Sequence, residues 1–196
     1  MACRIVLASQ SPRRKELLEQ VGLSFTVQSA DIDESVITGE AVDDYVLRVA
    51  TAKAQVIAQQ NKDAIVIAAD TTVTLDNHIL AKPVDYQDAV RMWSLLSGRK
   101  HQVKTTVVIA YTSLIWHVTV TTNVQFKDLT LDEMFAYWQT GEPCDKAGGY
   151  AIQGRAAAWV KSIDGSYSNV VGLPLYETLQ LLKQIQSQHF SEIYKN

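Results

Sequence analysis

The sequence has little cysteine and no long hydrophobic run. Its two cysteines, Cys3 and Cys144, are too few for a framework of disulfides. No apolar segment approaches the roughly 20 residues that a membrane-spanning helix needs. Residues 5–8 are apolar but too short for a signal-peptide core, so they predict a strand. Without a targeting signal or a disulfide pattern, a reducing cytoplasm is the expected location.

Positive charge is not in excess either. Lysine and arginine total 18 against 21 acidic residues, which gives a net charge of −3. Bulk, non-specific nucleic-acid binding needs a basic field and is therefore not expected. A few local cations would still suffice for a small anionic substrate. Hydrophobic residues make up 47% of the chain, which is enough for a packed core and excludes general disorder.

Several common site motifs are also missing. The chain has neither a Walker loop nor a G-x-G-x-x-G segment, so the usual nucleotide-binding loops are excluded. Its four histidines have no metal-ligand spacing with one another or with the cysteines. No arrangement of serine, histidine and aspartate residues in the sequence suggests a hydrolase triad.

What is present is a mixture of strand and helix patterns, without repeats or a Pro/Gly-rich linker. We expect one domain over residues 1–196, with a polar tail that frays after about residue 186. The long hairpin at 103–126 favours a mixed sheet flanked by helices over a purely parallel one. Hydrophobic periodicity and turn residues predict strands at 5–8, 64–69, 71–75, 79–80, 103–111, 115–126 and 159–163, and helices at 12–21, 42–60, 85–96, 130–141 and 174–184.

The first unusual feature is a run of three cations at positions 13–15. It follows Ser11, the expected N-cap, and Pro12, the expected first helical residue. Because a helix N-terminus carries partial positive charge, cations there are unfavourable unless an anion binds. Backbone amides, the hydroxyls of Ser9 and Ser11, and two arginines would suit a phosphate. A solvated basic patch, or pairing with the acidic stretch 31–34, is the alternative.

Two charged residues occupy positions that are otherwise apolar. Lys53 falls on the hydrophobic stripe of the helix predicted at 42–60, where it either snorkels to solvent or faces a partner in a cleft. Asp70 is expected to close the buried strand 64–69, and ligands of α/β sheets gather at the carboxyl ends of strands. A carboxylate there suits a general base or a metal ligand. A hydrogen-bonded turn aspartate is the alternative.

Two loops add weaker signals. Lys82 and Pro83 follow the small hairpin, and residues 142–154 are rich in turn-forming residues. The glycines of this second loop permit a close backbone approach. The amide of Gln153 both donates and accepts hydrogen bonds, which suits the reading of a base edge.

Together these segments resemble the Maf-like family of nucleoside triphosphate pyrophosphatases over residues 4–185. The order and spacing of the segments make the resemblance specific. One departure is Arg155-Ala156, which stands where the family often has a glycine-rich pair. The matching stretches are 7–18 (LASQSPRRKELL), 52–54 (AKA), 69–73 (ADTTV), 82–83 (KP), 96–98 (LSG), 101–103 (HQV), 142–148 (EPCDKAG), 150–154 (YAIQG) and 165–174 (GSYSNVVGLP).

The resemblance implies an inosine-triphosphatase-like α/β fold with two lobes around a nucleotide cleft. Arg13, Thr71 and Gln153 match the family branch that acts on dTTP and UTP. Hydrolysis by this branch yields the nucleoside monophosphate and pyrophosphate, and modified pyrimidine triphosphates are further expected substrates. The alternative is a nucleotide-binding regulator of cell division, or septum formation, with little turnover.

The resemblance also implies roles for individual residues. Asp70 is expected to accept a proton from the water that attacks the α-phosphorus. Thr71 and Gln153 are expected to select the pyrimidine. Independently of the resemblance, we take Glu34 and Asp70 as candidate ligands of a divalent cation, Mg²⁺ or Mn²⁺, although an acidic residue of the stretch 31–34 could equally pair with Arg13 or Arg14. A homodimer is expected, with no nucleic-acid or membrane partner. The full set of expected substrate-binding residues is Ser9, Arg13, Arg14, Lys53, Thr71, Lys82 and Gln153.

Overall fold

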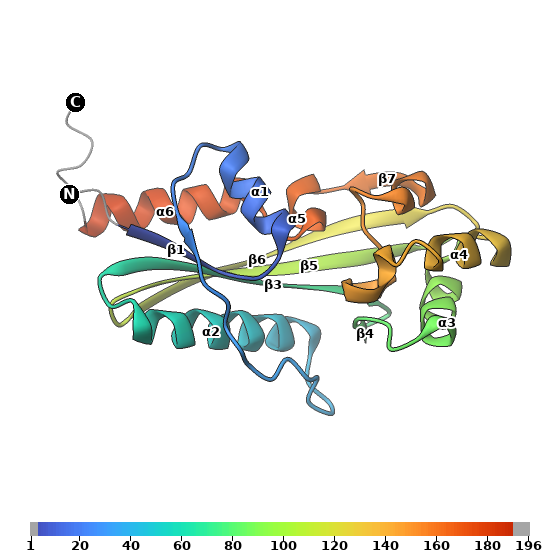
Figure 1. The fold of residues 1–196 in the computed structure, drawn as a ribbon, viewed down its shortest axis with the longest axis horizontal. Coiled ribbons are helices and arrows are strands. Elements are labelled where there is room, and N and C mark those ends of the chain that lie inside the picture. Colours follow the sequence, from blue (N-terminus) through green and yellow to red (C-terminus); the bar gives the residue numbers. More distant parts are fainter. Residues whose placement is uncertain (1–3, 190–196) are drawn as a thin grey trace. The chain divides into compact units, whose positions relative to one another are not determined.

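The computed structural model describes residues 4–189 (Figure 1). Within them, seven strands form one sheet with the order β2-β1-β3-β5-β6-β7, and β4 pairs with β3. β1 runs parallel to β2 and β3, whereas β4 and β7 are antiparallel to their neighbours, so the sheet is mixed as expected. The strands are β1 (Arg4–Ala8), β2 (Thr26–Val27), β3 (Ala64–Leu75), β4 (His78–Leu80), β5 (Lys100–Tyr111), β6 (Leu114–Phe126) and β7 (Val160–Asp164).

The main helices begin within one residue of the predicted positions, but the helix predicted at 130–141 ends three residues before its predicted end and the helix predicted at 174–184 continues five residues past its predicted end. Pro12 occupies the first turn of the first helix, and Gly22, with φ +73°, follows its end. Thr130 and Glu133 form a capping box at the start of the helix predicted at 130–141, each side chain accepting from the other residue's backbone N–H. The helices are α1 (Pro12–Gln20), α2 (Val42–Gln60), α3 (Tyr86–Leu96), α4 (Leu131–Trp138), α5 (Tyr167–Val171) and α6 (Leu175–His189), with 3₁₀ turns η1 (Glu142–Asp145), η2 (Ala147–Gly149) and η3 (Arg155–Trp159).

The chain forms two compact units. The first comprises the residues up to Asp70, Thr106–Thr119 and the residues from Gly172 onward. The second comprises Thr71–Thr105 and Val120–Val171. The expectation of a single domain over residues 1–196 stays a prediction. A frayed tail is expected from the sequence after about residue 186, but α6 continues to His189. The rest of the expected tail, residues 190–196, lies outside the described residues.

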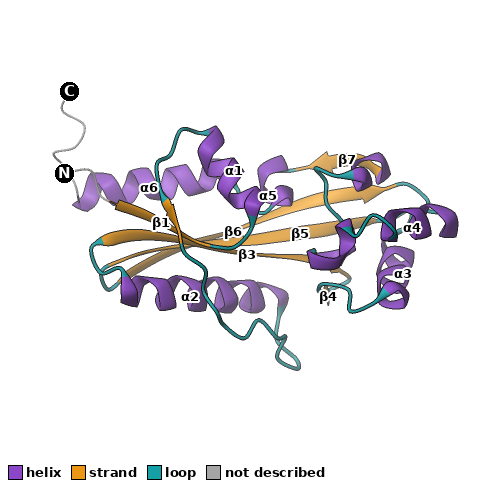
Figure 2. Cartoon of the chain, viewed as in Figure 1, coloured by secondary structure: helices purple, strands orange, loops and turns teal. Residues whose placement is uncertain are grey.

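In the first unit, helices cover both faces of the strands. Figures 1 and 2 show α2 on one side and α1 and α6 on the other. Small residues let α2 approach the sheet closely, since Ala50 and Ala54 are fully buried against Ala8 and Ala68 in one apolar cluster. β1 pairs with β3 in a parallel register that ends at Ala8 opposite Ala68. The chain therefore leaves β1 at Ser9 beside the part of β3 that leads to Asp70.

The second unit has an aromatic core. The rings of Trp93 and Trp159 have centroids 5.4 Å apart, and Tyr137 and Trp159 are separated by 4.7 Å, both in edge-to-face geometry. Phe126 and Tyr150 make a similar contact at 4.8 Å. These aromatic residues all belong to one buried apolar cluster.

The structure corrects the predicted end of the central strand. β3 is one continuous strand of 12 residues, so Asp70 lies in its middle and not at its carboxyl end. The sequence is continuously apolar before Asp70 and alternates after it, which suggests two strands. The threonines after Asp70 favour extended structure as valine does, so the strand continues through the aspartate. β2, α5 and the 3₁₀ turns were not predicted because elements of two to five residues are too short to show a period.

Candidate active site

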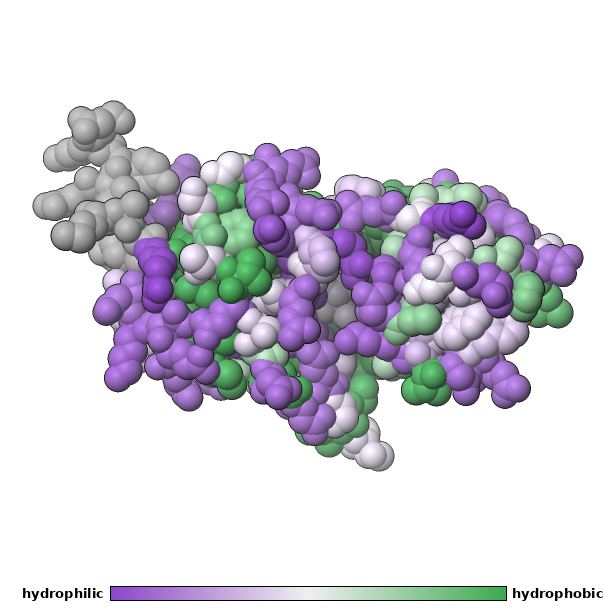
Figure 3. Space-filling model, in the orientation of Figure 1, coloured by the Kyte–Doolittle hydropathy of each residue, from purple (hydrophilic) through white to green (hydrophobic). Residues whose placement is uncertain are grey.

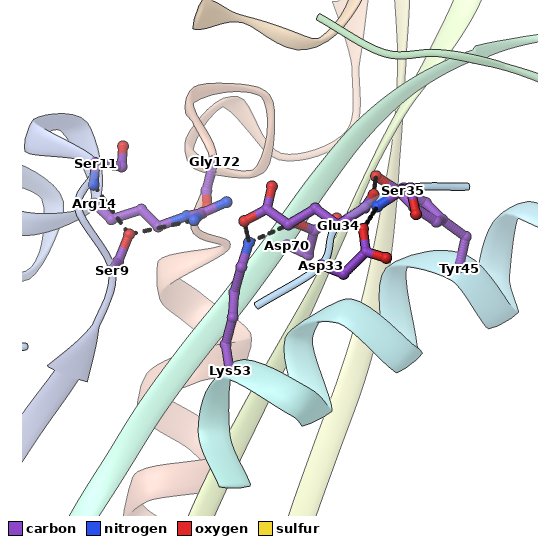
Figure 4. Close-up of polar contacts among 10 residues, drawn as sticks. All are labelled: Ser9, Ser11, Arg14, Asp33, Glu34, Ser35, Tyr45, Lys53, Asp70 and Gly172. Carbon is purple, nitrogen blue, oxygen red and sulfur yellow. Dashed lines mark hydrogen bonds and ion pairs between the residues drawn. The ribbon is translucent and has the colours of Figure 1, made fainter. Parts of the chain in front are cut away.

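A buried lysine joins two carboxylates in the first unit (Figure 4). Lys53 Nζ lies 2.9 Å from Asp70 Oδ1 and 2.8 Å from Glu34 Oε1. Lys53 is only 8% exposed and Asp70 only 5%. Lys53 therefore faces partners and does not snorkel, which settles the two alternatives that its position in the sequence left open. The apolar stripe of α2 carries the lysine into the fold, and β3 supplies the aspartate.

The second oxygen of Asp70 has no such partner. Oδ2 is buried and accepts no hydrogen bond from any residue that the structure describes. Leaving a buried polar atom unsatisfied costs about 1–3 kcal/mol, so such atoms in native structures call for an explanation. An oxygen with unused lone pairs, held in place through its neighbour Oδ1, is suited to accept a proton from water or to bind a cation.

The start of α1 forms a cationic corner near the end of β1. Arg14 donates from Nε to the backbone oxygen of Gly172 at 2.8 Å and from Nη1 to Ser9 Oγ at 3.3 Å. Burial lowers the pKa of Arg14, while the charge of Asp70 acts in the opposite direction. An arginine nevertheless stays protonated, so a fixed positive charge lies beside this carboxylate.

The first turn of α1 is suited to an anion. Ser11 occupies the N-cap position, but its side chain makes no capping hydrogen bond, and the first turn holds no acidic residue. Ser9 Oγ instead accepts from the backbone N–H of Ser11 at 3.1 Å. The amides of a helix N-terminus together with Arg14 make an arrangement that is typical of phosphate sites. Arg13 is partly exposed in the same turn.

The loop that carries Glu34 is tied to α2. Figure 2 shows the segment between β2 and α2 as a long stretch without helix or strand. Tyr45 Oη donates to the backbone oxygen of Glu34 at 3.1 Å. Arg48 donates to the backbone oxygen of Ser35 at 2.9 Å and forms a two-bond ion pair with Glu40. Sequence reasoning missed Tyr45 and Arg48, because only the fold brings α2 against this loop.

The electrostatics of the loop fit this arrangement. Burial and the nearby carboxylates of Asp70 and Glu34 raise the pKa of Tyr45 to about 12, so its hydroxyl remains a donor.

The tip of the loop carries Val36 and Ile37, which are 43% and 55% exposed. In Figure 3 hydrophobic atoms appear at this projecting tip, although most of the surface in view is hydrophilic.

The remaining expected site residues belong to the second unit. Thr105 Oγ1 donates its proton to the backbone oxygen of Asn169 at 3.1 Å. The proton of the 2.9 Å contact between Thr71 Oγ1 and Thr105 Oγ1 must therefore come from Thr71. Lys82 and Gln153 are both exposed.

Comparison with known proteins identifies the family. The sequence model described as "Maf-like protein" matches residues 4–185. This chain belongs to the Maf-like family. Relatives of this Maf-like chain include proteins named dTTP/UTP pyrophosphatase from Acinetobacter baylyi and Pseudoalteromonas atlantica. Each is 50% identical, over 92% and 94% of this chain and 99% and 98% of the relative, respectively.

Similar solved structures are more distant. The Ham1 protein of Staphylococcus aureus superposes with a TM-score of 0.44 and 15% identity, covering 64% of this Maf-like chain and 72% of that protein. A Ham1 protein from Coxiella burnetii has a TM-score of 0.43 and 17% identity, covering 63% and 72%.

The carboxylates of this Maf-like chain fit a cation shared with a substrate better than a closed metal cage. Within residues 4–189, no group of three or more His, Cys, Asp or Glu side chains is placed to hold a metal ion. Mg²⁺, however, is commonly held by only one or two carboxylates plus substrate phosphates. Glu34 and the unpartnered oxygen of Asp70 meet that requirement.

Across the described residues, no helix is both long and apolar enough to cross a membrane.

Proposed function

We propose that this Maf-like chain hydrolyses dTTP and UTP to the nucleoside monophosphate and pyrophosphate. Relatives of that name align with this chain over nearly their whole length, which supports the proposal. The observation that carries the proposal is the buried Asp70, with one oxygen held by Lys53 and the other unpartnered.

In the proposed reaction, Asp70 Oδ2 accepts a proton from the attacking water. Lys53 binds Oδ1 and thereby fixes the plane of the carboxylate. The water oxygen forms a bond to the α-phosphorus as the bond to the bridging oxygen of pyrophosphate breaks. General-base assistance of this kind contributes about 10²–10⁴-fold to a rate.

The cations of the chain would hold the triphosphate. Arg14, Ser9 and the amides of the first turn of α1 form the anion-binding corner in the first unit. Arg13 adds charge in the same turn, and we assign Lys53 and Lys82 to the phosphates as well. Guanidinium groups suit this role because they bind phosphate oxygens in pairs and stay charged.

We also propose that Glu34 and Asp70 hold a divalent cation, Mg²⁺ or Mn²⁺. When bound, such an ion neutralises charge on the phosphate oxygens. A direct test is the binding of Mn²⁺ followed by electron paramagnetic resonance. We expect Glu34→Gln to weaken binding, and unchanged affinity would contradict this assignment.

We assign pyrimidine selection to Thr71 and Gln153. The N3–H of uracil and thymine is a donor, and a threonine hydroxyl such as that of Thr71 can accept as well as donate a hydrogen bond. The Gln153 amide can pair with both donors and acceptors. Because the two bases share this hydrogen-bonding edge, a site that accepts one accepts the other. Modified pyrimidine triphosphates that keep the edge are further proposed substrates.

The proposed function is tested by product analysis. Purified protein is incubated with a panel of nucleoside triphosphates, with Mg²⁺, with Mn²⁺ and with a chelator. We expect UMP or dTMP together with pyrophosphate from UTP or dTTP. Nucleotide binding without turnover would contradict the proposal and favour the regulatory alternative.

Three further properties are proposed with this function. We place the protein in the cytoplasm, where nucleoside triphosphates are made and used. The net charge of −3 supports the absence of a nucleic-acid partner. We propose a homodimer, which light scattering on the purified protein would test. A monomeric mass at micromolar concentration would contradict it.

A further inference from the structure

Gln153 lies in a tight turn of the second unit. The backbone N–H of Gly154 donates to the oxygen of Ala151 at 3.1 Å and closes the turn. Ile152 points inward and is 8% exposed, whereas Gln153 next to it is exposed. The direction of the Gln153 side chain therefore depends on how firmly the two ends of this turn are held.

Two side chains hold those ends. Tyr137 Oη accepts from the backbone N–H of Ala151 at 3.1 Å, on the entry side of the turn. Glu142 Oε2 accepts from the backbone N–H of Arg155 at 3.2 Å, on the exit side. Tyr137 Oη also donates to Glu142 Oε1 at 2.6 Å, which links the two contacts. The three hydrogen bonds form one chain across the turn that carries Gln153.

Glycine at position 154 is explained by the same carboxylate. A Cβ on Gly154 would lie only 1.9 Å from Glu142 Oε1 and 2.3 Å from Oε2. The backbone φ of Gly154 is −107°, so its conformation alone does not require glycine. What requires it is the close approach of the carboxylate, which both of its hydrogen bonds hold in place.

The two side chains are themselves well anchored. Tyr137 is 4% exposed, and its ring packs edge-on against Trp159 in the aromatic core. Burial and the hydrogen bond to Glu142 raise the pKa of Tyr137, so the hydroxyl stays a donor. The backbone of Glu142 is held at both ends. Its N–H donates to Thr140 Oγ1 at 3.1 Å, and its oxygen accepts from Lys146 Nζ at 2.9 Å.

We propose that Tyr137 and Glu142 are positioning residues for pyrimidine selection. They form a clamp that fixes the turn Ala151–Gly154 and thereby aims Gln153 at the base. This inference rests on the proposed function, specifically on the role of Gln153. The clamp acts on discrimination among bases and leaves the phosphate chemistry at Asp70 to other residues.

The test is a double-mutant cycle on discrimination. The ratio of kcat/KM for UTP to that for CTP is measured in wild type, Glu142→Ala, Gln153→Ala and the double variant. We expect Glu142→Ala to lower the ratio roughly tenfold, the value of one hydrogen bond. We expect the double variant to match Gln153→Ala, because a clamp has no effect on discrimination once the residue it aims is gone.

Conservative variants and a matched control separate positioning from general destabilisation. Glu142→Gln keeps the size of the side chain but places a donor opposite either Arg155 N–H or the Tyr137 hydroxyl, so it should also lower the ratio. Tyr137→Phe removes the link and should do the same. Glu133→Ala removes the capping box of α4, the helix that carries Tyr137, without touching the turn. Its ratio should equal that of wild type.

The outcomes distinguish the clamp from the function on which it rests. No UTP hydrolysis by wild type overturns the proposed function. Hydrolysis with an unchanged ratio in Gln153→Ala overturns the role of Gln153 and the inference with it. A lowered ratio in Gln153→Ala but not in Glu142→Ala overturns the clamp alone. A ratio that falls as much in Glu133→Ala as in Glu142→Ala does the same. Faster amide exchange at Ala151 and Arg155 in Glu142→Ala alone would support the clamp independently of activity.

Discussion

Replacing Lys53 with methionine should destabilise the protein more than replacing Asp70 with asparagine. In Lys53→Met, the carboxylate of Asp70 stays buried with neither oxygen paired, since Oδ2 has no partner and Oδ1 loses the ammonium. Removing one partner of a buried ion pair costs about 3–5 kcal/mol. In Asp70→Asn, Lys53 keeps Glu34 at 2.8 Å, and the Glu34 side chain is 39% exposed, so the remaining pair is partly solvated.

The expected cost of Lys53→Met is therefore about 3 kcal/mol, and that of Asp70→Asn is about 1 kcal/mol or less. For a chain of this length, 3 kcal/mol corresponds to a fall in Tm of about 6–12 °C. The assay is urea unfolding followed by tryptophan fluorescence and circular dichroism. Lys15→Met is the matched control, because its pair with Glu19 is exposed at 3.6 Å and should contribute less than about 1 kcal/mol. Equal costs for Lys53→Met and Asp70→Asn, or a cost for Lys53→Met no larger than that of Lys15→Met, would show that Lys53 does not stabilise a buried Asp70 carboxylate.

Two further predictions concern other parts of the chain. Burial lowers the pKa of His101 to about 4 from 6.5, so an unfolded chain binds a proton there that the folded chain rejects. The free energy of unfolding should consequently fall as pH drops from about 6.5 to 4, by at most about 1.4 kcal/mol per pH unit from this residue. The free energy of unfolding of His101→Phe, measured by urea unfolding at several pH values, should change less between about pH 6.5 and 4 than that of the wild type. An identical pH dependence would show that His101 is not its cause. Arg48→Ala should loosen the loop that carries Glu34 and weaken Mn²⁺ binding roughly tenfold, as for other residues that orient metal ligands. Arg91→Ala, which removes an exposed pair with Asp88, is the control, and unchanged Mn²⁺ affinity in Arg48→Ala would show that the ion pair does not position Glu34.

Local sequence signals predicted much of the fold. Pro12 and Gly22 mark the ends of α1, and the Thr130–Glu133 box marks the start of α4, because capping chemistry depends on neighbouring residues alone. Lys53 on an apolar stripe predicted a buried charge with a partner as one of two alternatives. The end of β3 was misplaced at Asp70 because a polar residue inside a buried strand normally signals a turn. Here Lys53 stabilises it within the strand.

The residues that sequence reasoning missed act across long distances in the chain. Tyr45 contacts Glu34 from α2, and Tyr137 contacts Ala151 from α4. No local pattern marks these tyrosines, since both lie at apolar positions of helices where an aromatic ring needs no further explanation. Only the folded arrangement shows that their hydroxyls hold the loops on which proposed site residues lie.

The role of Asp70 as the general base is tested by the rate of UTP hydrolysis by Asp70→Asn at saturating nucleotide. Exposed Asp132→Asn serves as the matched control, and UTP binding is measured in parallel. We predict that Asp70→Asn binds UTP but loses about 10²–10⁴-fold in kcat, whereas Asp132→Asn stays near wild type. A folded Asp70→Asn variant that hydrolyses UTP within a few fold of the wild-type rate would show that Asp70 is not the general base.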